Sequence, residues 1–241
     1  MALHRVACAA VLLALSLPWI APPARAQARP TVVELFTSQG CSSCPPADAL
    51  LGELARRDDV IALGFHISYW DNLGWKDPFS RPQSTERQRV YARLFGGQIY
   101  TPQLVVDGTS EMVGSHRAEV IAALRDASHE AIAPVVFAAD RNSVTIGPAA
   151  IAGSTSSAGQ VTLVHFVQKR TTHVGAGENA SRILQDTNGV DALATLGAWQ
   201  GTQAEFAVEP PADGEGIAVL VQAADGHFLG AAIMLGSQSG G

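Results

Sequence analysis

Cysteine is scarce in this sequence, which has only Cys8, Cys41 and Cys44 among its 241 residues. A small secreted scaffold held together by disulfides needs many cysteines joined across long loops, so that class is excluded. A bridge between Cys41 and Cys44 closes almost no loop and adds little stability by restricting the unfolded chain. We therefore expect the single CxxC motif of this thiol-poor chain to serve chemistry.

Clusters of positive charge are also absent. The chain has 16 Lys and Arg against 22 Asp and Glu, which gives a net charge of −6. Without basic runs it lacks the footprint of a protein that binds nucleic acid or an anionic membrane surface. It has no glycine-rich nucleotide motif and no internal repeat, and spacing alone identifies no Ser-His-Asp triad. We therefore expect no cofactor.

Residues 1–26 have the layout of a secretory signal peptide. Arg5 precedes an apolar stretch at residues 6–20, and Ala24-Arg25-Ala26 fits the small-x-small pattern of a cleavage site. A membrane anchor is the alternative, but the stretch is shorter than the roughly 20 residues that a spanning helix needs. Cleavage would leave a mature chain with a net charge of −8, with no membrane span and with only one cysteine pair.

Strands and helices alternate through residues 30–130, the first expected domain. Pro45 and Pro46 suit the first turn of a helix, where their missing N–H groups do no harm. Apolar periodicity in the second helix points Val90, Tyr91 and Leu94 towards the core. We expect strands at residues 31–37, 60–68, 103–107 and 111–113 and helices at residues 45–57, 83–95 and 115–128. This β-α-β-α-β-β-α order, with the CxxC motif at the first strand-to-helix turn, resembles a thioredoxin core.

Residues 133–237 have a different residue pattern, in which Gly, Pro, Ser and Asn separate short apolar runs. Such a pattern is typical of antiparallel strands. Only residues 191–196 suggest a helix. We expect strands at residues 134–139, 143–146, 160–168, 203–208, 216–224 and 227–235. These would form an antiparallel β-rich domain or extension packed on the first part.

Four stretches, at residues 33–48, 65–75, 100–108 and 177–182, resemble the DUF1223 family of thioredoxin-like bacterial secreted proteins. The first of them, VELFTSQGCSSCPPAD, is the most specific. The resemblance implies an α/β fold with a thioredoxin-like core and a β-rich C-terminal part. It also implies a periplasmic or secreted location, but it supplies no substrate.

The CxxC pair is the predicted catalytic centre. Cys41 would lie at or just before a helix N-terminus, where the unpaired N–H groups favour a thiolate. It would attack a substrate disulfide, and the more deeply buried Cys44 would then resolve the mixed disulfide. Thioredoxin folds carry a cis-proline immediately before the third strand, so Thr101 and Pro102 are expected to bind the substrate. The alternatives are a static disulfide and an ordinary turn proline.

Three further residues are candidates for auxiliary roles. Asp48 lies one helical turn after Cys44 and would relay a proton to it, or would simply cap or solvate the start of the helix. His66 and Asp71 lie near the end of the second strand, the edge where active sites of α/β sheets gather. They would assist proton transfer or bind a metal, or they are structural. Glu178, Asn179 and Arg182 are expected to form a hydrogen-bonded turn that joins the two parts of the chain.

These observations predict a thiol-disulfide oxidoreductase that acts on protein or small-molecule thiols and disulfides, with an unidentified redox partner. One alternative is a thioredoxin-like protein that binds a soft metal such as copper through Cys41, Cys44 and a histidine such as His66. The cysteines of such proteins are generally spaced one residue wider, which counts against it, and no metal ligand set is assigned. The other alternative is a non-catalytic interaction module.

Overall fold

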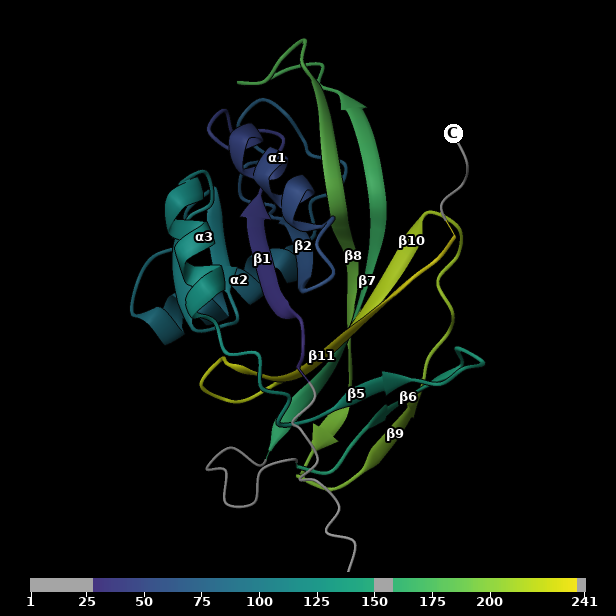
Figure 1. The fold of residues 1–241 in the computed structure, drawn as a ribbon. Coiled ribbons are helices and arrows are strands. Elements are labelled where there is room, and N and C mark those ends of the chain that lie inside the picture. The colour runs from purple at the N-terminus through teal and green to yellow at the C-terminus, as the bar shows by residue number, and fades with distance from the viewer. Residues whose placement is uncertain (1–27, 150–157, 238–241) are drawn as a thin grey trace, which may run out of the picture.

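The computed structural model describes residues 28–149 and 158–237. The predicted signal peptide, residues 1–26, and Cys8 within it lie outside the described residues. None of the described helices is both long and apolar enough to cross a membrane. The described chain is a mixed α/β structure with a large, mostly antiparallel sheet and few helices (Figure 1).

The first part of the chain has the predicted order of elements. They are β1 (Thr31–Thr37), α1 (Pro45–Leu54), β2 (Val60–His66), α2 (Pro82–Phe95), β3 (Gln103–Val106), β4 (Ser110–Val113) and α3 (Arg117–Asp126). β1 pairs in parallel with β2 and antiparallel with β3, and β3 and β4 form an antiparallel hairpin. A parallel pair needs a crossover, and α1 supplies it. The crossover brings the CxxC motif to the carboxyl end of β1.

The second part of the chain is formed by strands. They are β5 (Val135–Phe137), β6 (Ser143–Ile146), β7 (Gly159–His173), β8 (Ile183–Trp199), β9 (Ala204–Ala207), β10 (Glu215–Gln222) and β11 (Phe228–Leu235). Two sequence predictions are wrong here. β7 extends five residues beyond the predicted strand, and residues 191–196 belong to β8, not to a helix. β7 and β8 pair along almost their whole length as a long hairpin (Figure 1).

A single sheet runs through both parts of the described chain. Its strand order is β11-β10-β7-β8-β2-β1-β3-β4, and β5, β6 and β9 form a separate small sheet. β8 meets β2 at one pair of residues, Gly64 and Gly189. Gly64 suits this close approach, because a Cβ atom would lie 3.2 Å from the carbonyl oxygen of Thr187 and the neighbouring backbone would have to shift. The division into domains at residues 30–130 and 133–237 stays a prediction, and the sheet spans it.

Helix α2 presents a different face to the core than its apolar pattern predicts. Tyr91 is buried as expected, but Val90 and Leu94 are 45% and 39% exposed. The buried face is polar and consists of Ser84, Thr85, Gln88 and Tyr91. Polar groups can be buried when they find hydrogen-bond partners. The Thr85 hydroxyl accepts the Ser68 N–H at 2.9 Å and the Gln88 amide donates to the Tyr100 carbonyl at 2.7 Å, whereas the Gln88 side-chain oxygen has no partner among the described residues. In α3, Val120 and Leu124 are buried as predicted.

A buried polar cluster anchors α2 to both parts of the sheet. Arg87 of α2 forms an ion pair with Glu34 of β1, whose side chain is fully buried, and Tyr91 donates a hydrogen bond to the same carboxylate. Gln222 of β10 accepts a hydrogen bond from Arg87 at 3.2 Å and donates one to Tyr91 at 2.9 Å. The Arg87 guanidinium also lies 5.6 Å from the ring centroid of Phe65. The charge of Glu34 is thus fully paired inside the core.

Candidate functional site

The two cysteines lie where β1 turns into α1. The Cys41 N–H donates to the carbonyl of Ser38 at 3.1 Å, and the Cys44 N–H donates to the carbonyl of Cys41 at 3.2 Å. Cys44 is the residue immediately before α1, and Pro45 and Pro46 fill its first turn. The cysteines form a disulfide with a Cα–Cα distance of 5.5 Å. The pair is therefore placed at a helix N-terminus, as the sequence predicts.

Both cysteines are fully shielded from solvent. Each is 0% exposed, while Ser42 and Ser43 between them are exposed. The expectation that Cys44 is more deeply buried than Cys41 is therefore wrong. The Ser43 hydroxyl lies 3.3 Å from the sulfur of Cys41, within hydrogen-bonding distance. A reagent can reach the sulfurs only after something covering them moves.

The loop between β7 and β8, residues 174–182, is hydrogen-bonded to the backbone of the CxxC turn, and we call it the cover loop. The Asn179 side-chain amide, on a residue that is 1% exposed, donates to the carbonyls of Gln39 and Cys41, each at 2.9 Å. The Glu178 carboxylate accepts the Ser42 N–H at 3.0 Å. Arg182 donates to the Asn179 side-chain oxygen at 2.8 Å and fixes the orientation of that amide. The predicted hydrogen-bonded turn is confirmed, and it is hydrogen-bonded to the CxxC segment.

Two tryptophans connect the CxxC turn to its surroundings. The Trp70 indole N–H donates to the Thr101 hydroxyl at 2.9 Å, and the Thr101–Pro102 peptide bond is cis. A Cβ atom on Gly40 would lie 3.4 Å from the Trp70 Cβ, so this tryptophan lies directly against the residue before Cys41. Trp75 donates to the Gln39 side-chain oxygen at 3.3 Å. Both tryptophans, which are partly exposed, thus contact the turn or the residues next to it.

Behind the turn, His66 sits in a buried acidic network. Its Nδ1 lies 2.7 Å from Asp77, and its Nε2 lies 3.6 Å from Asp186 of β8. Gln39 links the two acids, because its backbone N–H donates to Asp77 at 2.8 Å and its side-chain amide donates to Asp186 at 2.7 Å. Burial alone would lower the pKa of His66, but the hydrogen bond to Asp77 and the charges of Asp77, Asp186 and Asp48 raise it to about 9. The imidazole is therefore cationic at neutral pH.

The acids around His66 respond differently to burial. Burial raises the pKa of Asp186, although His66 and Gln39 oppose the change. Burial would also raise the pKa of Asp77, but its hydrogen bond to His66 and the charge of that imidazole bring it below the usual value. Sequence reasoning found His66 and missed both partners. They lie 11 and 120 positions away along the chain, and no local pattern connects them.

Asp48 is half-buried beside the CxxC helix start. Its carboxylate accepts a hydrogen bond from the Thr37 hydroxyl at 2.7 Å, and it caps no helix N–H group, so the capping alternative is wrong. Burial raises the pKa of Asp48 to about 7, and the charge of His66 and the Thr37 hydrogen bond only partly oppose it. The predicted proton-relay role of Asp48 remains a prediction.

Asp71 has a structural environment. It accepts hydrogen bonds from the Asp77 backbone N–H at 3.3 Å and from the Ser80 hydroxyl at 2.7 Å, which shape the loop after β2. Asp71 therefore contacts the His66 network through Asp77, and it forms no hydrogen bond with Cys41 or Cys44.

The metal-binding alternative concerns Cys41, Cys44 and His66. Across residues 28–149 and 158–237, no group of three or more His, Cys, Asp and Glu side chains is arranged to hold a metal ion. Both ring nitrogens of His66 already face carboxylates, so the imidazole offers no free lone pair to a soft metal beside Cys41 and Cys44.

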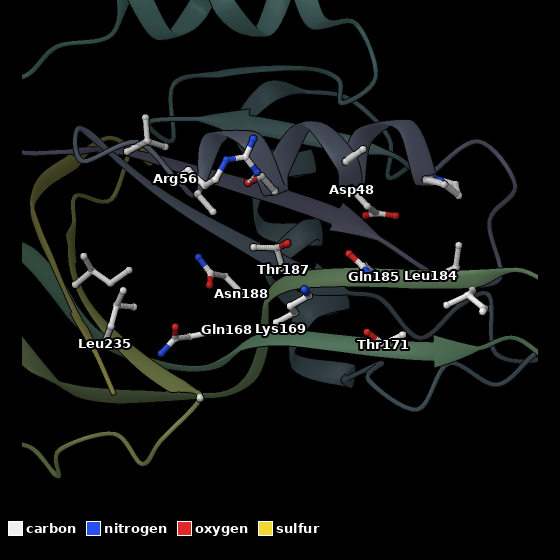
Figure 2. Close-up of a pocket in the computed structure, with 18 of the residues that line it drawn as sticks. Asp48, Arg56, Gln168, Lys169, Thr171, Leu184, Gln185, Thr187, Asn188 and Leu235 are labelled. Atoms are coloured by element: carbon white, nitrogen blue, oxygen red, sulfur yellow. Dashed lines mark hydrogen bonds between the residues drawn. The ribbon is translucent and has the colours of Figure 1, made fainter. Parts of the chain in front are cut away.

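A cleft of about 890 Å³ lies next to this site, between α1 and the β7–β8 hairpin (Figure 2). We call it the α1–β8 cleft. Pro45 and Asp48 line the end nearest the cysteines, and Arg56 and Leu235 line the other end. Its size falls within the range of about 300–1,000 Å³ that is usual for ligand pockets.

The fold and the site together define a mixed α/β protein with a CxxC disulfide at the N-terminus of its first helix. The chain belongs to the family described as "Protein of unknown function (DUF1223)", whose model matches residues 32–222. The resemblance found in the sequence is therefore confirmed.

Two solved structures are similar to the chain. Protein AGR_C_4864 from Agrobacterium tumefaciens is 30% identical, with a TM-score of 0.72 over 89% of this chain and 97% of that chain. HBP35 of Porphyromonas gingivalis is 14% identical, with a TM-score of 0.55 over 89% and 78% of the respective chains, and the likeness concerns the fold alone. No curated protein matches the chain.

Proposed function

We propose that this protein is an exported thiol-disulfide oxidoreductase of the bacterial cell envelope with a thioredoxin-like core. The observation that carries the proposal is the Cys41–Cys44 disulfide at the start of α1, in a described chain that holds no other thiol. Helix N-termini stabilise thiolates, and the thiolate is the species that attacks disulfides. The location of the pair at the start of α1 also makes Cys41 reactive once the disulfide is reduced, because the helix N-terminus stabilises its thiolate.

The exchange follows from two successive thiolate attacks. In the reduced protein, the Cys41 thiolate attacks one sulfur of a substrate disulfide, forms a mixed disulfide and releases the other substrate sulfur as a thiolate. The Cys44 thiolate then attacks the Cys41 sulfur, closes the Cys41–Cys44 disulfide and releases the second substrate thiol. The substrate gains two electrons and the protein loses two. The same steps in reverse oxidise a dithiol substrate.

Thr101 and Pro102 are proposed to border the substrate. Trp70 connects them to the CxxC turn, because it holds the Thr101 hydroxyl and packs against Gly40. Pro102 itself is buried, whereas Thr101 is partly exposed. The cover loop lies over the same turn, and we propose that it must move before a substrate reaches Cys41.

The decisive experiment is a redox titration of the mature protein in glutathione or dithiothreitol buffers, with trapped thiols at Cys41 and Cys44 counted by mass. A midpoint near about −120 mV would make the protein an oxidant of exported proteins, and one near about −270 mV a reductant that needs an electron donor. A pair that stays oxidised well below about −300 mV behaves as a structural bridge and overturns the proposal.

A trapping experiment tests the assigned roles of the two cysteines. The Cys44→Ser variant is expected to accumulate a mixed disulfide through Cys41, because the resolving thiol is missing. The matched Cys41→Ser variant is expected to accumulate none. Equal trapping by both variants would contradict the roles, although the redox titration would still decide the activity.

A further inference from the structure

The α1–β8 cleft is a site that the proposed exchange reaction does not use. Its walls are α1 on one side and the β7–β8 hairpin on the other, and the end of β11 closes it away from the cysteines (Figure 2). Asp48 and Gln185 lie towards the end near the start of α1, and Arg56 lies at the far end (Figure 2).

The charge of the cleft is opposite to that of the protein. Three cations line it, Arg56, Lys169 and Arg182, against one carboxyl group, that of Asp48. None of the three is in a salt bridge with any described residue, and the Lys169 side chain makes no hydrogen bond with any described residue. Arg56 and Arg182 donate only to neutral oxygens. The whole chain has a net charge of −6, so this cleft is a positive site on an acidic molecule and attracts anions.

The length of the cleft favours an extended ligand over a small ion. Asp48 lies in α1 and Arg56 lies two residues after the last residue of α1, Leu54; if the helical rise of about 1.5 Å per residue continues through this turn, the eight positions between them span about 12 Å. An extended peptide advances about 3.3 Å per residue, so about four residues span this distance. A single phosphate or carboxylate cannot contact cations at both ends of the cleft.

The walls provide apolar contacts. Ala49, Gly52 and the C-cap residue Ala55 line the α1 side with small or absent side chains, and at Gly52 the helix approaches β8 closely, because a Cβ atom there would lie 3.1 Å from the Thr187 hydroxyl oxygen. Ile183 and Leu235 are apolar lining residues that are 68% and 47% exposed. Exposed large apolar side chains beside unpaired cations suit a ligand that carries both apolar and acidic groups.

We propose that the α1–β8 cleft is a docking site for an extended acidic segment of a polypeptide with interspersed apolar side chains. This inference rests on the proposed function in one respect, namely that the docked segment belongs to a protein whose disulfide is exchanged at Cys41. Arg182 connects the two sites, because it lines the cleft and also holds Asn179, which in turn holds the Cys41 carbonyl. A carboxylate that draws Arg182 away from Asn179 loosens the cover loop over the disulfide.

Fluorescence anisotropy of a fluorescein-labelled hexapeptide of alternating glutamate and leucine tests the docking. The oxidised protein is titrated without reductant, so binding is read with no thiol chemistry. We expect saturable binding that weakens with added salt. The double variant Arg56→Gln/Lys169→Gln is expected to bind about tenfold more weakly, which corresponds to about 1.4 kcal/mol. The control Arg93→Gln/Arg125→Gln removes the same charge from exposed sites outside the cleft and is expected to bind like the wild type.

Several outcomes would overturn the docking proposal. They are the absence of binding, equal weakening in both double variants, and equally tight binding of a matched hexapeptide of glutamine and leucine. Displacement of the probe by inorganic phosphate at the concentration at which the unlabelled peptide displaces it would show a small-anion site instead. Because the binding is measured on the disulfide form, a failure of the redox titration leaves this result intact, and a failure here leaves the titration intact.

Discussion

The Asn179 side chain ties the cover loop to the CxxC turn, and if opening of this loop exposes the disulfide, a quantitative prediction follows. Asn179→Ala removes two buried hydrogen bonds, to the carbonyls of Gln39 and Cys41, each 2.9 Å long. Each hydrogen bond contributes about 1 kcal/mol, so the closed state of the cover loop loses about 2 kcal/mol of stability relative to its open state. About 1.4 kcal/mol is a tenfold change, so the open population rises about 30-fold.

The assay is the rate at which dithiothreitol reduces the disulfide, followed by quenched mass spectrometry under native conditions. If local opening precedes reduction, Asn179→Ala is expected to be reduced up to about 30-fold faster than the wild type. The control is Asn72→Ala, an exposed asparagine outside the cover loop, which is expected to leave the rate unchanged.

Two results would refute this reasoning. One is an unchanged reduction rate in Asn179→Ala, which would mean that the loop does not limit access to the sulfurs. The other is a wild-type rate that rises with urea as steeply as global unfolding does. In that case the sulfurs react only in the unfolded chain, since local opening exposes little surface and depends weakly on denaturant.

The remaining predictions concern buried charged groups, and each is tested by the free energy of unfolding measured in urea. The pKa of Asp48 is about 7 in the folded protein, above its value in the unfolded chain. The stability of the wild type relative to Asp48→Asn is therefore expected to fall as the pH rises from about 4 to 7. A stability difference that does not change with pH would contradict this. The folded pKa of His66, about 9, is also raised, so its stabilisation is present below about 6.5 and lost as the pH rises through about 9. Asp77→Asn is therefore expected to be most destabilising near pH 6, and a deficit that grows above pH 9 would argue against the pairing. Glu34→Gln leaves Arg87 without its buried partner and is expected to cost about 3–5 kcal/mol, and a loss below about 1 kcal/mol would show that the ion pair is not intact.

Local chemistry explains which parts of the fold could be predicted from the sequence. The β-branched run of β1, the CxxC turn and the two prolines of α1 each act within a few residues, so their order and position were predictable. The same holds for the Asp107-Gly108 turn between β3 and β4, where both residues have positive φ.

Long-range polar pairing explains what could not be predicted. α2 buries a polar face because Arg87 and Gln88 find partners on distant strands, so its apolar residues do not mark its inner side. β8 carries Asp186, Asn188 and Gly189, which break the strand pattern, yet Asp186 and Asn188 are buried with partners more than 100 positions away. From the sequence alone such residues are predicted to lie in loops, because no nearby residue indicates their hydrogen-bond partners.

The contact between β2 and β8 makes the first half of the chain dependent on the second. In the intact sheet β2 lies between β1 and β8, and the Asn188 amide donates to the carbonyl of Ala62 at 2.9 Å. Without the second half, β2 would become an edge strand, all of whose side chains are now buried, and such edges template aggregation. We therefore expect the CxxC half to fold poorly when it is separated from the strands that follow it. Substitutions at the contact between β2 and β8 in one half are constrained by the residues of the other half.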